Sequence, residues 1–178
     1  MPSITEFAAI KLKAPYTVYT DPLPNLLELV RKRQSNWSSY EFYYFTDIND
    51  DTTAYLITGW DSVPAHHEWI KSDGNQELLQ LFEPYMESVS LRHLDMTFDQ
   101  DIFQAKEIVY EHENEKTMGK EGPESGSPRR EVVWTGRAID LEDPDSGYHH
   151  LTIFSRAWEE GSEVNKNRII LKRLDRME

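Results

Sequence analysis

A histidine on a predicted strand is the best-placed general acid or base in this sequence. Segment 89–98 alternates like a strand and carries His93 in its middle. The alternation places Asp95 on the same face as His93, and Arg92 on the opposite face. An imidazole titrates near neutral pH, so it can both donate and accept a proton. We expect His93 to be the polar centre of a cavity, oriented by Asp95, with Arg92 available to stabilise a carboxylate or enolate.

Aromatic side chains are candidates for the walls of such a cavity. They make up 12% of the 178 residues, including five Trp and nine Tyr, although the mean hydropathy is only −0.68. Rings with polar tips can hold a rigid apolar ligand and still bond its carbonyl. The alternative for each ring is packing in the core. The alternative for His93 is a structural histidine whose hydrogen bonds are made by a neighbouring backbone or carboxylate group. The predicted substrate-binding residues are Trp60, Trp69, Tyr44, Tyr55 and Trp134.

Other histidines do not form a metal-binding pattern. His66, His67 and Glu68 follow one another on a predicted helix, where adjacent side chains point about 100° apart. No further ligand type stands three or four residues away, so we predict no metal site. His149 and His150 begin a strand and point to opposite faces, so at most one of them enters a cavity. Phosphate-binding glycine loops and dinucleotide fingerprints are absent as well, so we predict no cofactor.

Composition excludes several classes of function. The 19 Lys and Arg against 32 Asp and Glu give a net charge of −13, which disfavours nucleic acid and anionic membranes as partners. There is no cysteine, hence no disulfide, thiolate nucleophile or Fe–S cluster. No apolar run reaches the ~20 residues of a membrane span, and the first residues lack a signal-peptide pattern. These features predict a cytoplasmic protein.

The elements that must position these residues follow the ferredoxin-like order in the first half. Periodicity predicts strands over 4–13, 40–45, 53–60 and 89–98, with a helix over 22–35 and helices beginning near Ser62 and Asp73. The order is therefore β-α-β-β-α-β.

The second half repeats this pattern with pieces missing. Strands are predicted over 102–111, 131–140, 149–158 and 168–175, while the polar, Gly- and Pro-rich segment 113–130 replaces the first helix with a flexible loop. Residues 171–175 match residues 91–95 as Leu-Lys/Arg-x-Leu-Asp.

One such unit leaves a sheet face bare, and two can cover each other. We therefore predict an α+β fold of two ferredoxin-like repeats, spanning 1–98 and a degenerate 99–178, that form a dimeric α+β-barrel-type architecture within one chain. A homodimer that pairs first repeats is the competing arrangement.

The segment from Trp60 to Asp73 carries a family resemblance. Its Trp-Asp-Ser-Val-Pro-Ala-His-His-Glu-Trp-Ile-Lys-Ser-Asp sequence resembles the Trp-x-Ser…Trp-Leu-Lys-Ser stretch of the dimeric α+β-barrel superfamily, in its antibiotic-biosynthesis-monooxygenase branch. Within that branch it looks most like fungal proteins with a tandem, degenerate second domain. The superfamily includes cofactor-free monooxygenases, haem-degrading oxygenases, polyketide cyclases and members without known activity.

Three departures from the family's patterns narrow the implied function. Leu79 stands where haem-degrading members place their axial histidine. Leu56 stands where monooxygenases of aromatic substrates keep an Asn. Asn75 is near the position of a histidine in the plant-type polyketide cyclase, and an amide is no base near neutral pH.

The resemblance implies a cofactor-independent enzyme of secondary metabolism that binds a hydrophobic polyketide or terpenoid intermediate. We favour cyclisation or isomerisation, pericyclic ring closure included, because holding a reactive conformer needs neither metal nor flavin. The alternatives are a cofactor-free monooxygenase of aromatic substrates and a non-catalytic ligand-binding barrel. The expected partner is a hydrophobic small molecule, with neither nucleic acid nor membrane, and a homodimer remains open.

Overall fold

The structure is a computed structural model that describes residues 3–113, 131–155 and 168–174. The first half contains, in order, β1 (Ile4–Leu12), α1 (Leu23–Ser38), β2 (Phe42–Asp47), β3 (Asp50–Trp60), α2 (Val63–Lys71), α3 (Asp73–Phe82) and β4 (Met86–Leu94). The second contains α4 (Gln100–Phe103), β5 (Glu107–Glu113), β6 (Val132–Ile139), the 3-10 turn η1 (Pro144–Ser146), β7 (Tyr148–Phe154) and β8 (Arg168–Arg173).

The predicted element order is confirmed in the first half and needs one correction in the second. Residues 102–111 were expected to form one strand, but this segment begins with the end of α4. The Asp99 side chain accepts hydrogen bonds from the N–H groups of Asp101 and Ile102, which caps a helical turn before β5 begins. Of the expected loop 113–130, residues 114–130 lie outside the described residues.

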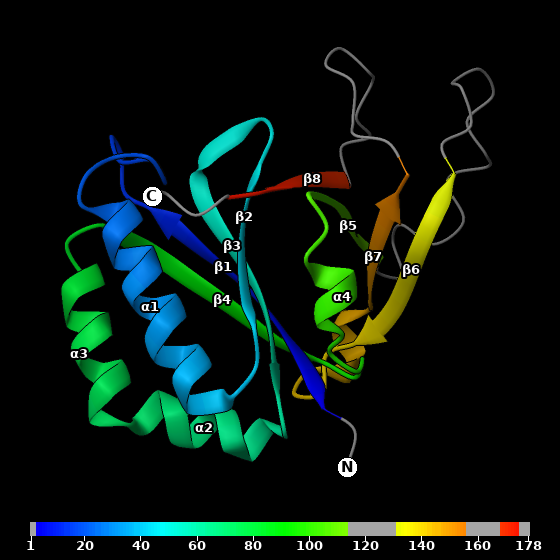
Figure 1. Cartoon of the computed structure of the whole chain (residues 1–178), viewed down its shortest axis with the longest axis horizontal. Coiled ribbons are helices and arrows are strands. Elements are labelled where there is room, and N and C mark those ends of the chain that lie inside the picture. Colours follow the sequence, from blue (N-terminus) through cyan, green and yellow to red (C-terminus); the bar gives the residue numbers. More distant parts are fainter. Residues whose placement is uncertain (1–2, 114–130, 156–167, 175–178) are drawn as a thin grey trace.

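The eight strands of the described residues form one antiparallel sheet in the order β4-β1-β3-β2-β8-β5-β7-β6. Each half therefore has the strand order 4-1-3-2 of a ferredoxin-like unit, so the predicted fold class is confirmed. β2 joins the halves by pairing with β8, where Phe45 faces Arg173. At the other end of the sheet, a bridge between Leu94 and Asp140 brings β4 against the end of β6. The sheet curls so that its two halves face each other (Figure 1).

The interior between the two halves is a packed core. The Phe7 ring stacks on Tyr110 at 4.5 Å and on Tyr55 at 6.0 Å between ring centroids, which joins a β1 side chain to one on β5. Aliphatic side chains from both halves, such as Ile57, Leu94, Leu151 and Leu171, surround these rings. These side chains fill the space in which we expected a ligand.

Helices α1, α2 and α3 cover the other face of the first four strands (Figure 1). Two clusters of buried side chains lie beneath them. One joins Leu23 and Leu27 of α1 to Ala8 and Tyr44 of the sheet. The other contains Trp60, Trp69 and Leu78. No helix in the described residues is long and apolar enough to cross a membrane.

Candidate functional site

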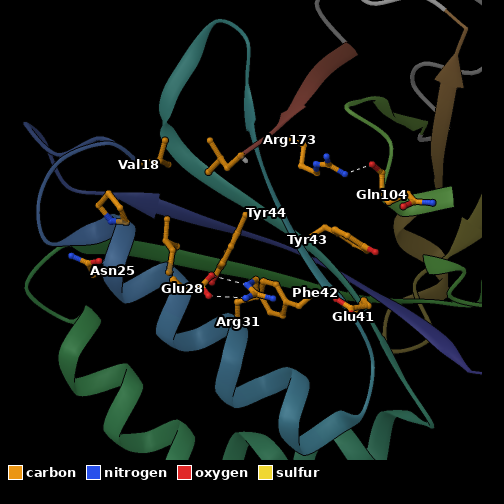
Figure 2. Close-up of a pocket in the computed structure, with 13 residues that line it drawn as sticks. Val18, Asn25, Glu28, Arg31, Glu41, Phe42, Tyr43, Tyr44, Gln104 and Arg173 are labelled. Atoms are coloured by element: carbon orange, nitrogen blue, oxygen red, sulfur yellow. Dashed lines mark hydrogen bonds and ion pairs between the residues drawn. The ribbon is translucent and has the colours of Figure 1, made fainter. Parts of the chain in front are cut away.

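A pocket of about 380 Å³ lies between α1 and the strands β2 and β8 (Figure 2). Its apolar surface comes from Val18, Leu27, Phe42 and Leu174. Its charged surface comes from Glu28, Arg31, Glu41 and Arg173. Polar and apolar side chains line the pocket in similar measure, so it fits a ligand that has both an apolar part and polar groups.

Tyr44 contributes a buried hydroxyl to this region. The side chain runs from β2 towards the Glu28–Arg31 pair of α1 (Figure 2), and the residue is only 6% exposed. Its hydroxyl has no hydrogen-bond partner among the described residues. Burial raises the pKa of the Tyr44 phenol well above its ordinary value, and the nearby carboxylates of Glu6 and Glu28 raise it further. The hydroxyl is therefore a protonated hydrogen-bond donor at any physiological pH.

Arg31 is held by a bidentate ion pair on α1. Its Nε and Nη2 atoms donate to the two carboxylate oxygens of Glu28, each at 2.7 Å. These hydrogen bonds lower the pKa of Glu28 and raise that of Arg31. Glu28 is thus a carboxylate that fixes the guanidinium rather than a base. The pair uses two of the five N–H groups of Arg31, so the guanidinium retains donors for an anionic or carbonyl oxygen.

A buried acid of β1 lies beneath the next turn of α1. Glu6 of β1 is 2% exposed, and its Oε2 accepts hydrogen bonds from Trp60 Nε1 at 2.6 Å and Gln34 Nε2 at 2.9 Å. Burial raises the pKa of Glu6 to about 7, although the two donors oppose this shift. The sequence does carry a signal for it, because Glu6 is the one charged residue on the strand face of Ile4, Ala8 and Ile10.

Two histidines extend this polar cluster. His66 Nε2 lies 3.6 Å from Glu6 Oε2, and His66 Nδ1 lies 2.7 Å from His93 Nε2. The His66 ring stacks on Trp60 with centroids 4.4 Å apart. Burial lowers the pKa of His66 to about 3, so this imidazole is neutral. His66 shares the inner side of α2 with Trp69, three residues on.

His93 lies on the helix-covered face of the sheet and not in the barrel interior, where we expected it. Its strand register places it opposite Glu6 of β1. The alternation along β4 is as predicted, but at this end of the strand both His93 and its neighbour Leu94 are buried, so alternation does not reveal which face the helices cover. The carboxylate beside His93 is Glu142, whose Oε2 lies 2.5 Å from His93 Nδ1. The other oxygen of Glu142 lies 3.1 Å from His67 Nε2.

The remaining predicted residues are divided between the two faces. Asp95 does not orient His93, because its carboxylate accepts the N–H of Ile139 at 2.8 Å. Arg92 lies on the barrel face, where burial raises the pKa of Tyr110 and the positive charge of Arg92 opposes that shift.

The five aromatic candidates are also divided. Trp60 and Trp69 pack together under the helices, and Tyr44 lies nearby at the pocket. Tyr55 and Trp134 pack against the barrel core. No single cavity therefore unites the predicted set, and a catalytic role for His93 stays a prediction.

A second polar group lies inside the barrel. His149 points inward, and its Nδ1 shares a hydrogen bond with the Tyr110 hydroxyl at 2.9 Å, while His150 points outward to Glu113. The expectation that at most one of these two histidines turns inward is thus met. His149 Nε2 has no partner among the described residues, and the ring stacks on His112 at 4.6 Å. Burial lowers the pKa of His149 to about 4, and the neighbouring His112 adds to this effect.

The depressed pKa of His149 predicts acid-sensitive stability. Between pH 6.5 and pH 4 the unfolded chain binds a proton that folded His149 does not, so the free energy of unfolding falls as pH falls. On going from pH 7 to pH 5 we expect His149 to account for a loss of about 2 kcal/mol. Urea unfolding measured at pH 7 and at pH 5 gives the total loss of unfolding free energy between the two pH values. In His149→Phe this total loss should be smaller than in wild type by about 2 kcal/mol. Tyr110→Phe keeps the titrating ring, so an equal reduction there would contradict the assignment.

Comparison with known proteins supports the fold and leaves the family open. No family model matches the sequence, and no curated protein resembles it. Among solved structures, a proposed monooxygenase from Fusobacterium nucleatum subsp. nucleatum has a TM-score of 0.61 and 11% identity, over 98% of this chain and 93% of its own. A proposed chlorite dismutase has a TM-score of 0.54 and 10% identity, over 98% and 96%. A proposed monooxygenase from Lactobacillus acidophilus has a TM-score of 0.52 and 9% identity, over 98% and 94%. This chain thus shares its two-repeat α+β-barrel fold with proteins of similar length.

Proposed function

We propose that this protein is an enzyme that binds a small, largely apolar carbonyl compound in the pocket between α1 and β2 and promotes its cyclisation or isomerisation. The observation that carries the proposal is the buried hydroxyl of Tyr44, a residue that lines this pocket, because the part of the chain that the structure describes gives it no hydrogen-bond partner. A buried hydroxyl without a partner carries an energetic cost, and a ligand oxygen that reached it would relieve that cost.

In this proposal two kinds of donor would serve the same ligand oxygen. Tyr44 supplies a neutral O–H, and Arg31 supplies charged N–H groups fixed by Glu28. Negative charge that develops on a carbonyl oxygen during enolisation or ring closure is stabilised by donors positioned in advance. The apolar side chains of Leu27 and Phe42 would hold the rest of the molecule in one conformer. A polyketide or terpenoid intermediate has this chemistry.

Oxygenation is the second candidate, because two of the full-length fold neighbours are named as monooxygenases. A cofactor-free oxygenation also begins with an enolate or phenolate, which the same donors would stabilise. The two reactions differ in whether dioxygen is consumed. An oxygen electrode therefore separates them with the same substrate and enzyme.

Ligand binding tests the site directly. We would titrate the protein with cyclic 1,3-diketones and dihydroxynaphthalenes by calorimetry, and follow solvent deuterium exchange at the acidic C–H by NMR. Tyr44→Phe removes one hydrogen bond, so the affinity should fall roughly 5–10-fold. Tyr55→Phe is the matched control, because Tyr55 lies on the barrel side of the adjacent strand. No binding of any probe, or equal affinity in the two variants, would refute this site.

A further inference from the structure

Three side chains at the barrel closure bring together the ligand set of a transition metal. His67 comes from α2, His93 from β4 and Glu142 from the segment after β6. One ligand atom from each lies within 4.8 Å of the other two. The carboxylate lies between the imidazoles, with one oxygen 3.1 Å from His67 Nε2 and the other 2.5 Å from His93 Nδ1. We propose that this trio binds one divalent first-row transition metal ion such as Zn²⁺, a site separate from the Tyr44 pocket.

The donor types agree with this class of ion. Two imidazole nitrogens and one carboxylate oxygen suit Zn²⁺ and its neighbours in the first transition row, whereas Ca²⁺ and Mg²⁺ prefer oxygen ligands alone. The sequence pattern did not reveal these three ligands, because His93 and Glu142 lie far from His67 in the chain and not on the same helix. Three protein ligands leave at least one coordination position for water or another small molecule.

Hydrogen bonds to their backbone groups hold His93 and Glu142 in place without a metal. The Asp140 carboxylate accepts hydrogen bonds from the N–H groups of both His93 and Glu142, at 3.2 Å and 3.1 Å. The Leu141 N–H donates to the His93 carbonyl at 2.8 Å. The segment that carries Glu142 is therefore fixed against β4, so little ordering is left for the ion to impose.

The groups behind His93 form the outer shell that a metal-bound imidazole needs. If His93 Nδ1 binds the ion, its Nε2 carries the proton and donates to His66 Nδ1 at 2.7 Å. His66 Nε2 then carries its own proton towards Glu6 Oε2, 3.6 Å away. This choice of tautomers gives the His93 Nε2 proton an acceptor and turns the His66 Nε2 proton towards Glu6, at a distance longer than a hydrogen bond. Such a chain from carboxylate through imidazole fixes the orientation of a ligating histidine and increases its basicity.

An ion can reach this site from solvent. The His67 and Glu142 side chains are 41% and 43% exposed, whereas His93 is fully buried. The ion would cross-link α2, β4 and the segment after β6, where the barrel closes through the bridge between Leu94 and Asp140. A site of this kind stabilises the folded state in proportion to metal binding.

Metal binding by the whole chain tests the proposal. Zn²⁺ is titrated by calorimetry, and Co²⁺ is titrated while its visible d–d absorption is recorded. Wild type should bind one ion per chain, and its Tm should rise with the Zn²⁺ concentration. His67→Ala and Glu142→Gln change partly exposed side chains, so both should fold. Loss of one of three ligands should weaken Zn²⁺ binding by at least ~100-fold, since even outer-shell changes cost 10–100-fold.

A matched control distinguishes this site from an ordinary ion pair. His150 and Glu113 also form a partly exposed histidine–carboxylate pair at 3.0 Å, but Arg137 lies 3.7 Å from the same Glu113 oxygen. His150→Ala should therefore leave Zn²⁺ affinity and the Co²⁺ spectrum unchanged. The proposal is overturned if wild type binds no ion, or if His67→Ala and Glu142→Gln bind Zn²⁺ as tightly as His150→Ala does.

Discussion

Replacing Trp60 by alanine is expected to lower the free energy of unfolding by about 4–6 kcal/mol. The indole is 1% exposed and packs beneath the helices with Trp69 and the His66 ring. Its removal creates a large cavity, which alone costs about 3–5 kcal/mol. It also removes the N–H that donates to Glu6 at 2.6 Å and so leaves a buried carboxyl group with one donor fewer. Chemical denaturation followed by circular dichroism measures the change.

Two further substitutions separate these contributions. Trp60→Phe keeps most of the packing and deletes the hydrogen bond, so it should cost roughly 1–3 kcal/mol and remain foldable if the alanine variant does not. Trp37→Ala is the control, because this tryptophan is 53% exposed although it touches Trp69. A loss at Trp37 as large as that at Trp60 would show that the cluster beneath the helices does not carry this stability.

Phe7→Ala is expected to cost about 3–5 kcal/mol through the barrel core. The Phe7 ring is 1% exposed and contacts Tyr55 of its own half and Tyr110 of the other half. Because its contacts span both halves, the loss should lower the stability of the whole barrel and not of one half. Calorimetry should therefore show one transition at a lower Tm in the variant.

The control for this prediction is an outward-facing barrel residue. Val133 of β6 is 64% exposed, and Val133→Ala should change the free energy of unfolding by no more than about 0.5 kcal/mol. Separate transitions for the two halves of Phe7→Ala would contradict the single core described above. A Phe7→Ala variant as stable as Val133→Ala would do so equally.

Local pattern was enough to predict the fold. Strand alternation, helix periodicity and the repeated Leu-Lys/Arg-x-Leu-Asp segment led to two ferredoxin-like units, and the sheet order has that form twice. The two periodicities are local signals, because they depend on side chains two to four residues apart. The division into domains at residue 98 stays a prediction, since the sheet runs continuously from β2 to β8.

The site was harder to predict because its parts come together over long distances in the chain. Alternation grouped His93 with Asp95, but the carboxylate beside His93 belongs to Glu142, 49 residues away, and nothing local shows this. At the end of β4 that carries His93, neighbouring side chains on both faces are buried, so the sequence there offers no hydrophobic contrast to distinguish the inner from the outer side. The sequence shows Glu6 as a charged residue among apolar neighbours. Its hydrogen bonds to Trp60 and Gln34 depend on tertiary structure and could not be predicted from the sequence.

The position of β8 between β2 and β5 has a consequence for synthesis on the ribosome. This strand is the last of the eight to be translated, yet it joins the two halves. From Leu94 to Arg173 there are 173 − 94 = 79 residues, which take ~4–16 s at ordinary elongation rates. During that time β1 to β4 can form beneath their helices while the edge of β2 and the inner face around Phe7 remain uncovered. An unpaired strand edge beside an apolar face favours association between nascent chains, so a chaperone that binds such surfaces should increase the yield of folded protein.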